Sequence, residues 1–594
     1  MANKRSENLL GQETELAIRF QPASHCTHPG NKIIFDYFHE AIASLVKTRS
    51  GKRSFIQDQF FVQNGGAIYY EHHPQSLRKG LIETATPECS STHELVLYQR
   101  AAERLLEKAK PVAIDLLKAD GIEGELSLLK NCRDYEGNTY GSQENYDAEL
   151  ASGKSLWLFR SCLIAYLPIA LVFKLLYVLL LLPFVFSIFC AKFCLESLLF
   201  VLSGLSLRSR DKNRSLLSTL QLVLQGHCER LSFDNNDHDE FLLKFEYALF
   251  YPLFWLSYKP LIVIYNRFAF LPQRQALGAH CISRIVYTGA GSLLENQDFI
   301  LSEKSLAITQ SERRSIHRTD KPIFDCGNLI KDYELAIWEL FIFRLKSWSH
   351  IFSRGQRLQI AFSDSNRCHL SEFLKIGTTN LLVRMANRGL LSDAPQIQRS
   401  AEALHMVTAD LDFKNKIETK SHGLMTVFEI QQWYLNQARS FLHSEEHSAH
   451  VTMEDHEVIR LWTETLEGLQ RSPEKLIGRI DWVTKKYLLQ TSSDELDYWE
   501  LKKIDLKYHE IGTGYFDLLQ RDGLTLDVFT SEEVETAVYE PSSPDRVKLR
   551  SRLIRSIQLA DQPMTISWSQ AKVGRWNPKV ISLKDYQNFK DTNL

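Results

Sequence analysis

Apolar and polar residues follow different patterns at the two ends of the chain and in its middle. Apolar runs or alternations predict strands at 15–20, 57–63, 66–70 and 357–364. Apolar positions at helical spacing predict helices at 94–117, 335–348, 429–442 and 456–469. Strands interleaved with helices indicate an α+β catalytic body.

The middle of the chain is apolar over an unusual length. Residues 161–190 read SCLIAYLPIALVFKLLYVLLLLPFVFSIFC, with Lys174 as the only charge. This run exceeds the ~20 apolar residues that a membrane-spanning helix needs. Apolar sequence continues to Leu207 and ends in a basic cluster of Arg208, Arg210, Lys212 and Arg214. An aromatic-rich stretch at 241–270, interrupted by charges, is typical of a segment at a membrane interface.

Two interpretations of the apolar middle remain open, a membrane-contacting insert and a helical hairpin buried in a large core. Because leucines occupy every side of the predicted helix, membrane contact through residues 157–207 is favoured. Pro168 and Pro183 are expected to kink or break the helix, which suits a hairpin or re-entrant path. The basic cluster would then face the cytoplasm.

Length and composition limit the classes of protein. A chain of 594 residues predicts several units, placed here at 1–150 and 271–510 (catalytic), 151–270 (apolar helical insert) and 511–594 (small C-terminal domain). The net charge of −2, from 70 basic and 72 acidic residues, gives no reason to expect nucleic acid as a partner. Ten cysteines without a CxxC pair argue against a disulfide framework and indicate cytosolic thiols.

Several acidic positions are candidates for chemistry. Glu13 and Glu15 lie two apart in a predicted strand, so both side chains share a face and suit Mg²⁺, although a solvated strand face is the commoner explanation. Glu71 ends a short apolar strand and Glu83 follows it along the chain. Asp364 and Asn366 follow another strand and suit either a metal–nucleotide or a helix cap. The run 137–146 predicts a tight polar turn.

In this order the motifs resemble the Pup ligase and depupylase family, the proteasome accessory factor A type. The matching segments are GQETE at 11–15, NGGAIYYE at 64–71, IETATPEC at 82–89, KNCRDYEGNTYGSQENY at 130–146, and RLQIAFSDSN with the following LKIGTT at 357–379. Towards the C-terminus, GYFDLLQRDGL and DRVKLRSRLI are also similar to the family. Apart from the insert, the resemblance covers nearly the whole chain.

The resemblance implies a glutamine synthetase-like antiparallel sheet flanked by helices, and Mg²⁺ and ATP as cofactors. It implies the roles of individual residues as well. Glu13, Glu15, Glu83 and Glu144 would hold the metal; Glu144, Asn145, Asp364, Asn366, Arg546 and Arg550 would bind the nucleotide; and Glu71 would stand in for the catalytic aspartate. The enzyme would phosphorylate the C-terminal glutamate side chain of a Pup-like tag and join it to a substrate lysine through an isopeptide bond.

The chain departs from the family pattern at several positions. Gln143 and Gln359 replace histidines, and the segment 324–332 lacks the arginine expected to face phosphate. The cations that could substitute for that arginine are Arg313, Arg314, Arg318 and Lys321. These changes keep two alternatives open, a depupylase-type hydrolase and a membrane-bound pseudoenzyme that binds the tag without chemistry.

The position of the insert restricts its topology. The proposed site draws residues from both sides of 157–207, so the insert must enter and leave a membrane on the same side. The sequence therefore predicts a ligase on the cytoplasmic face of a membrane.

Overall fold

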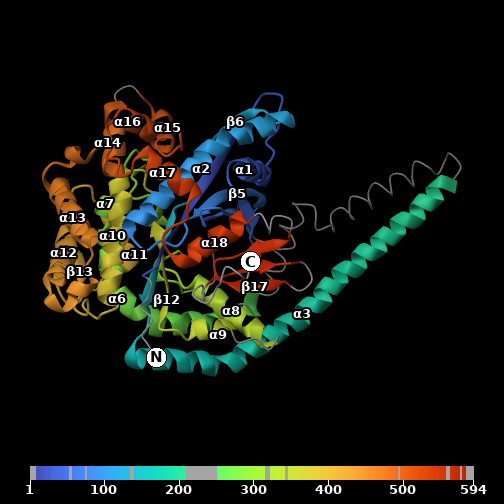
Figure 1. The fold of residues 1–594 in the computed structure, drawn as a ribbon, viewed down its shortest axis with the longest axis horizontal. Helices are drawn as coiled ribbons and strands as arrows, with labels where there is room; N and C mark the ends of the chain where they lie inside the picture. The colour runs from blue at the N-terminus through green and yellow to red at the C-terminus, as the bar shows by residue number, and fades with distance from the viewer. Residues whose placement is uncertain are drawn as a thin grey trace.

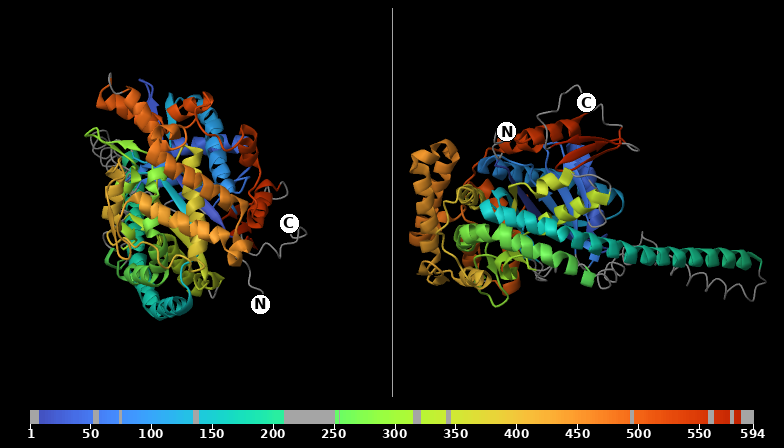
Figure 2. Two further views of the ribbon diagram at one scale, coloured as in Figure 1. Left: turned by 90° about the vertical axis from the view of Figure 1, so that its left-hand side faces the viewer. Right: turned by 90° about the horizontal axis from the view of Figure 1, so that it is seen from below.

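The computed structural model describes residues 8–51, 57–73, 76–133, 139–208, 251–253, 255–314, 321–341, 346–492, 496–556, 562–574 and 578–583. This part of the chain folds around one large sheet, with helices on both faces and at one end (Figures 1 and 2). One helix, α3, extends far beyond the body (Figure 1).

The large sheet has ten strands in the order β10–β11–β12–β7–β1–β5–β4–β3–β2, with β6 pairing with β1 off this path. The strands are β1 Leu10–Pro22, β2 Thr48–Ser50, β3 Gln57–Val62, β4 Ala67–His73, β5 Ser76–Ala85, β6 Gly124–Leu129, β7 Ser142–Glu149, β10 Gln310–Glu312, β11 Pro322–Phe324 and β12 Gly355–Ser363. All pairs are antiparallel except β10 with β11. Strand β7 precedes the apolar insert and β12 follows it in the chain. Because these two strands are neighbours, residues before and after the insert belong to the same sheet.

Strand β1 illustrates how the sequence makes a two-sided sheet. Its side chains alternate between buried and half-buried along most of its length. Gln12, Thr14 and Leu16 point to one face, and Glu13 and Glu15 to the other, as the period of two in a strand requires. The first face is covered by the helical core; the second carries the acidic residues.

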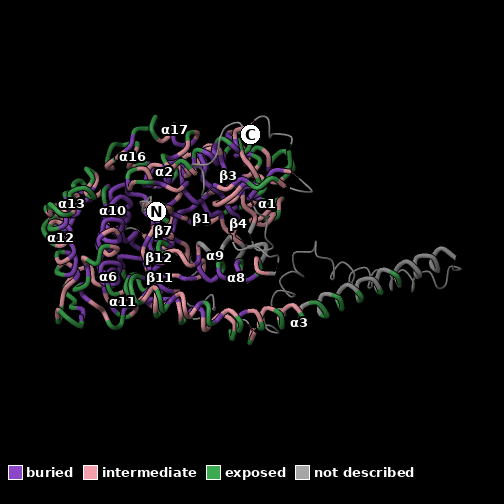
Figure 3. The backbone as a smooth tube through the Cα atoms, turned by 60° about the horizontal axis from the view of Figure 1, so that its bottom comes forward, coloured by how far each residue is buried: buried purple, intermediate pink, exposed green. Residues whose placement is uncertain are grey.

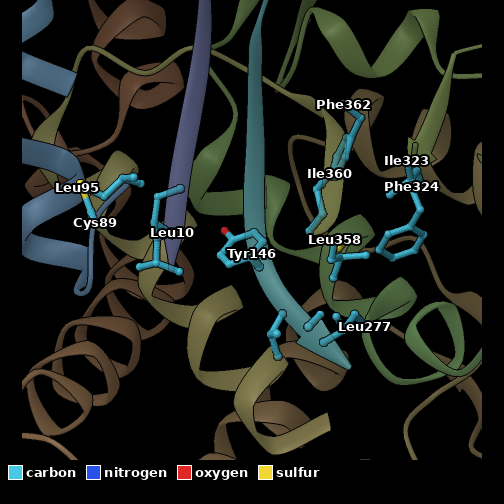
Figure 4. Close-up of a cluster of buried hydrophobic side chains, with 14 of the residues drawn as sticks. Leu10, Cys89, Leu95, Tyr146, Leu277, Ile323, Phe324, Leu358, Ile360 and Phe362 are labelled. Carbon is cyan, nitrogen blue, oxygen red and sulfur yellow. The ribbon is translucent and has the colours of Figure 1, made fainter. Parts of the chain in front are cut away.

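Helices cover the first face and form the main hydrophobic core (Figure 3). These helices are α1 Asn31–Leu45, α2 Thr92–Ala119, α6 Phe270–Ser283, α7 Ile285–Thr288 and α10 His369–Ala386. Helix α2 begins at a cap in which the Ser91 side chain accepts a hydrogen bond from the Glu94 backbone. Figure 4 shows Leu10 of β1, Tyr146 of β7 and Leu358 of β12 projecting into this core.

A mainly helical region lies at one end of the sheet (Figure 1). Its helices are α11 Ser400–Ala409, α12 Val427–His443, α13 Met453–Arg471, α14 Asp481–Ser492, α15 Tyr498–Lys507, α16 Tyr515–Arg521 and α17 Ser531–Tyr539. Short elements pack with them or join them: β8 Ser292–Leu293, β9 Phe299–Ile300, η2 Lys304–Ala307, β13 Ile417–Thr419, β14 Gly423–Met425, η3 Glu445–His450 and η4 Pro473–Leu476. Capping boxes at Thr426 and Thr452 fix the starts of α12 and α13.

The C-terminal elements cover part of the acidic face. They are α18 Asp545–Arg555, β15 Met564–Ile566, β16 Gln570–Val573 and β17 Lys579–Ser582. Leu549 and Leu553 of α18 pack with Phe61, Tyr69 and Ala85 in a second, smaller core. Registers Ala67↔Ala85 and Ala85↔Glu13 place this core on the same face as Glu13.

Helix α3, Gly153–Arg208, is the apolar insert. Its first part packs on the body, with Phe159, Leu163 and Tyr166 buried in the main core. It lies beside residues 255–264, η1 Tyr265–Ala269, and α8 Gly327–Phe341, which is followed by α9 Lys346–Ile351. Within the described residues one helix is long and apolar enough to cross a membrane, over Gly153–Leu180.

The predicted fold class, an α+β fold with a mainly antiparallel sheet flanked by helices, is confirmed. The predicted strands and helices coincide with elements of the structure. Residues 342–345 of one predicted helix, and the basic residues Arg210, Lys212 and Arg214, lie outside the described residues. The domain boundaries stay predictions.

Two local predictions differ from the structure in whole or in part. Residues 137 and 138 of the predicted polar turn at 137–146 lie outside the described residues, and most of the remainder is strand, because β7 begins at Ser142 and runs through the centre of the sheet. Of the two effects predicted for Pro168 and Pro183, a break is absent, because α3 continues through both residues, whereas the helix does bend as it leaves the body (Figure 1). A proline removes one backbone hydrogen bond, and the helical bonds on either side hold the segment together.

Candidate active site

Four carboxylates share the open face of the sheet. Glu13 and Glu15 belong to β1, Glu83 to β5 and Glu71 to β4. Glu15 is directly opposite Glu83, and Glu83 is directly opposite Tyr69, two residues before Glu71. Opposed residues of antiparallel strands project to the same face, so all four side chains do so. The structure therefore brings together Glu13, Glu15, Glu71 and Glu83 as the sequence predicts.

This face of the sheet carries more negative than positive charge. Burial raises the pKa of Glu83, and the neighbouring carboxylates Glu71, Glu13 and Glu15 raise it further, while Arg357 opposes the shift. The Arg357 guanidinium lies 3.6 Å from the Glu13 carboxylate. Clustered carboxylates are stabilised by a cation between them, and hard oxygen ligands suit Mg²⁺. Among the described residues, however, no three side chains converge closely enough to define a single ion position.

Glu144 does not join this cluster. It is directly opposite Gln12, so it projects to the helical face, away from Glu13. There it is fully buried and receives two hydrogen bonds from the Arg284 guanidinium, at 2.6 and 3.0 Å. Tyr146 and Ser363 donate to the same carboxylate. The prediction that Glu144 binds metal and nucleotide with Glu13 is therefore wrong, and Glu144 forms a buried structural ion pair.

Asn145, the next residue, lies on the acidic face. It is opposite Gly11 on β1 and Gln359 on β12. Its side-chain oxygen is buried without a hydrogen-bond partner among the described residues. Since buried polar atoms are nearly always paired, this oxygen remains available to a ligand. Asn145 stays a candidate for nucleotide binding.

Asp364 and Asn366 lie within the protein and are occupied by internal contacts. Asp364 accepts hydrogen bonds from the backbone of Ala290 and of Lys304, at 2.8 and 3.1 Å. Asn366 donates to the Thr288 carbonyl and to Asp481, and accepts a bond from the ammonium group of a buried lysine in α10. The prediction of direct nucleotide contact is wrong for both residues. Asp364 instead positions the turn that carries Lys304.

Arg550 and Arg546 join the C-terminal elements to the sheet. The Arg550 guanidinium is fully buried and bonds both oxygens of Glu88, at 2.7 and 2.8 Å. Arg546 lies 3.9 Å from the same carboxylate. Burial alone would raise the pKa of Glu88, but the two arginines hold it below its usual value. Arg550 also stacks on Trp568, so the predicted nucleotide role of Arg550 is replaced by a structural one.

Two lysines lie at the edge of the acidic face. The Lys321 ammonium donates to the Thr139 hydroxyl at 2.5 Å. The Lys304 ammonium lies over Gly141, where an added Cβ would come within 2.6 Å of it. The Gly141 carbonyl accepts a hydrogen bond from the Glu15 backbone, which places both lysines beside the carboxylates.

These lysines are the cations best placed to face phosphate. Burial and the charge of Lys304 lower the pKa of Lys321, while Glu15 and Glu71 act in the opposite direction. Of the substitutes that the sequence suggests for the missing arginine, Arg313 is paired with Asp325 at 2.6 Å. Arg314 is largely exposed and Arg318 lies outside the described residues. The sequence did not predict a role for Lys304. Gly141, which lacks a side chain and so leaves room for this lysine, was the signal that could have indicated it.

The two glutamines that replace family histidines contact each other. Gln359 of β12 donates to Gln143 of β7, and Asn328 of α8 donates to Gln359 at 2.7 Å. Gln143 is directly opposite Glu13, so this chain of amides borders the acidic face. It connects the start of α8 to the site.

On the acidic side of the sheet, the C-terminal elements reach the site as well. The Trp568 indole donates to the Tyr69 hydroxyl at 2.8 Å, and Tyr69 is opposite Glu83. The acidic face is thus bordered by α18 and the small sheet on one side and by the start of α8 on the other. Carboxylates beside the ammonium groups of Lys304 and Lys321 form a surface suited to a metal-bound polyphosphate.

A family model described as "Pup-ligase protein" matches residues 10–572. The chain belongs to the Pup-ligase family. Its curated relatives include the Pup–protein ligase of Mycolicibacterium smegmatis, 24% identical over 537 residues that cover 88% of this chain and 86% of the relative. That of Mycobacteroides abscessus is 25% identical over 534 residues with the same coverage.

Solved structures of Pup-ligase family members have the same fold. The crystal structure of the complex between the prokaryotic ubiquitin-like protein Pup and its ligase PafA aligns with a TM-score of 0.63 and 18% identity, covering 98% of this chain and 90% of that one. The Pup ligase PafA in complex with ADP aligns with a TM-score of 0.58 and 19% identity, covering 96% and 94%.

The predicted family and the predicted ligase class are confirmed. The relatives are named as ligases, which favours ligation over the hydrolase and the pseudoenzyme. The resemblance that the motifs indicate therefore holds even though Glu144, Asp364 and Asn366 have internal roles in this structure.

Proposed function

We propose that this enzyme uses Mg²⁺ and ATP to activate the C-terminal glutamate side chain of a Pup-like tag and to join it to a substrate lysine. The observation that carries the proposal is the acidic face of the Pup-ligase fold, where Glu13, Glu15, Glu71 and Glu83 lie beside Lys304 and Lys321. Bound there, Mg²⁺ would neutralise phosphate charge.

The other residues of the site have separate roles in the proposed reaction. Glu13, Glu15 and Glu83 would hold the metal. Lys304 and Lys321 would contact the phosphates as the tag carboxylate attacks the γ-phosphorus and ADP leaves. The lysine nitrogen of the acceptor would then attack the acyl phosphate, phosphate would leave, and Glu71 would take the proton lost by the amine. A lysine with a pKa near ~10.4 is almost fully protonated at pH 7, so a base at this position is valuable.

A reconstituted reaction tests this proposal. The full chain is incubated with a Pup-like protein ending in glutamate, a lysine-bearing acceptor, ATP and Mg²⁺. The expected result is an isopeptide-linked product by mass spectrometry, with one ADP formed per conjugate and no product in the presence of EDTA. Cleavage of a preformed conjugate without ATP turnover would overturn the ligase proposal in favour of the hydrolase. Binding of the tag without either reaction would overturn it in favour of a pseudoenzyme.

We also propose that the outer part of α3 anchors the enzyme in a membrane, with the catalytic domain on the cytoplasmic side. A helix of 56 residues extends for ~84 Å, which exceeds the ~30 Å thickness of a bilayer core. Leu179, Leu182 and Phe186 of the outer part are exposed. Residues on both sides of the insert share one sheet, so the insert must return to the side it left.

Removing the outer part should make the enzyme extractable from membranes. The deletion must spare Phe159, Leu163 and Tyr166, which belong to the core, so deleting all of 157–207 would unfold the body. Residues 181–248 are replaced by a short Gly-Ser linker, because Tyr177 and Leu253, on the two sides of the deletion, line the same cavity. The full chain should resist carbonate extraction and the deletion variant should not; resistance of both would contradict the anchor.

A further inference from the structure

Apart from the outer part of α3, exposed apolar side chains also gather on three neighbouring helices of the body. These are the docked part of α3, the helical residues 255–264 and α8. Seen from below, α3 lies between the other two helices (Figure 2). The exposed apolar residues of the three helices are Trp157, Leu158, Ile164, Ile169, Val172, Leu175, Leu176, Trp255, Leu256, Val263, Leu335 and Trp338, which together are called the docking face below.

Three charged side chains of these helices are turned towards the protein, whereas Lys154 at the start of α3 and Lys331 and Asp332 in the first half of α8 are exposed. Arg160 of α3 donates to the Phe352 carbonyl at 2.9 Å, and Lys174 pairs with Glu334 of α8 at 2.5 Å. Lys259, in the second helix, donates to the Arg314 carbonyl at 2.7 Å. A helix at the surface of a soluble body would keep its charges in water and its apolar side against the core. On α3 the outward side is apolar from Trp157 to Leu176, while Arg160 and Lys174 face inward.

Helix α8 extends this surface onto the catalytic domain itself. Its inner side is buried through Tyr333, Ala336 and Ile337. Leu335 and Trp338, one helical turn apart, are 48% and 40% exposed on its outer side. The Lys174 ammonium lies 5.5 Å from the Trp338 ring, so the two helices meet at this point. Tryptophan is favoured where an apolar surface meets lipid headgroups.

We infer that the docking face lies flat on a lipid bilayer, so that α8 and residues 255–264 contact lipid together with α3. The occupant is lipid because α3, which forms the middle of the docking face, reaches a mean hydropathy of 2.3 over an 18-residue window within Gly153–Leu180 that is 17% buried. A single protein partner would need a matching apolar surface of comparable extent. The inference deepens the proposed membrane anchoring and does not depend on the ligase reaction.

Vesicle binding by the variant lacking 181–248 tests the docking face without the anchor. This variant should bind phosphatidylcholine vesicles reversibly and with little dependence on salt, because the contact is apolar. Adding Leu335→Glu and Trp338→Glu should weaken binding at least about tenfold, since each places a charge against lipid. Trp499→Glu is the matched control, because Trp499 is 61% exposed on α15, on the side of the body away from α3 (Figure 1).

Three outcomes would overturn the inference. One is unchanged vesicle binding by the double α8 variant, with circular dichroism showing an intact fold. Another is a lipid-independent dimer of the deletion variant that the α8 substitutions dissociate, which would assign the docking face to a second copy. The third needs no substitution: the tryptophan fluorescence of the deletion variant should be quenched by brominated lipids, and an absence of quenching would exclude contact. Ligase activity, measured separately, would report on the proposed reaction alone.

Discussion

Replacing Glu71 with glutamine is expected to slow isopeptide formation by about 10²- to 10⁴-fold, the usual contribution of a general base. Glu71 is half-buried on the acidic face, close enough to Glu83 to raise its pKa. Glutamine keeps the shape of the side chain but cannot accept the proton of the acceptor lysine. The measurement is the initial rate of conjugate formation at saturating ATP, with ATP affinity measured by titration calorimetry.

The pH dependence distinguishes a base from a binding residue. Without a base, the residual rate depends on the neutral fraction of a lysine with a pKa near ~10.4, so it should rise about tenfold per pH unit between 7 and 9. Glu71→Asp should retain more activity than Glu71→Gln. Asp58→Asn is the control, since Asp58 is opposite Tyr70 and projects to the other face of the same sheet. A wild-type rate for Glu71→Gln, or a flat pH profile, would exclude the role of Glu71 as a base.

Replacing Arg284 with methionine is expected to lower the free energy of unfolding by about 3–5 kcal/mol, because it leaves a buried carboxylate unpaired. Arg284 and Glu144 are both fully buried, and the guanidinium bonds both carboxylate oxygens. The stability is measured by urea denaturation. Arg399→Ala, which removes the exposed pair with Glu402, is the control and should cost less than about 1 kcal/mol.

The partner of Arg284 provides the decisive comparison. If Glu144 is structural, Glu144→Gln should lower stability, and combining it with Arg284→Met should recover part of the loss, since the pair is then removed as a unit. If Glu144 were a metal ligand, as the sequence predicts, Glu144→Gln would keep the stability and weaken Mg²⁺-dependent ATP binding. That second result would contradict the geometry of β7.

The sequence predicted the acidic face better than its surroundings, for a physical reason. Glu13 and Glu15 share a face through the local period of a strand, and Glu71 and Glu83 fall on strands that pair with their neighbours in antiparallel registers. Glu144 was assigned wrongly because its face depends on the register Gln12↔Glu144, which is non-local. Its partner Arg284 lies 140 residues away in the chain.

Strand β7 carried a signal that could have corrected this prediction. Tyr146, Ala148 and Leu150 alternate with polar residues and are all buried, which is typical of a half-buried strand. Extending the same alternation backwards places Glu144 with them and Asn145 on the opposite side. The internal roles of Asp364 and Asn366 could not be predicted in this way, because they depend on η2 and α14, which approach only in the folded chain.

Helix α8 has a consequence for the choice of acceptor. Its first turn touches the catalytic sheet through Asn328 and Gln359, and its outer side carries Trp338. On the inferred membrane orientation α8 lies along the bilayer, so its width of ~10 Å, rather than its length, would separate the reaction centre from the headgroups. Lysines on short juxtamembrane loops would come within reach, whereas those on domains held far out by long stalks would not.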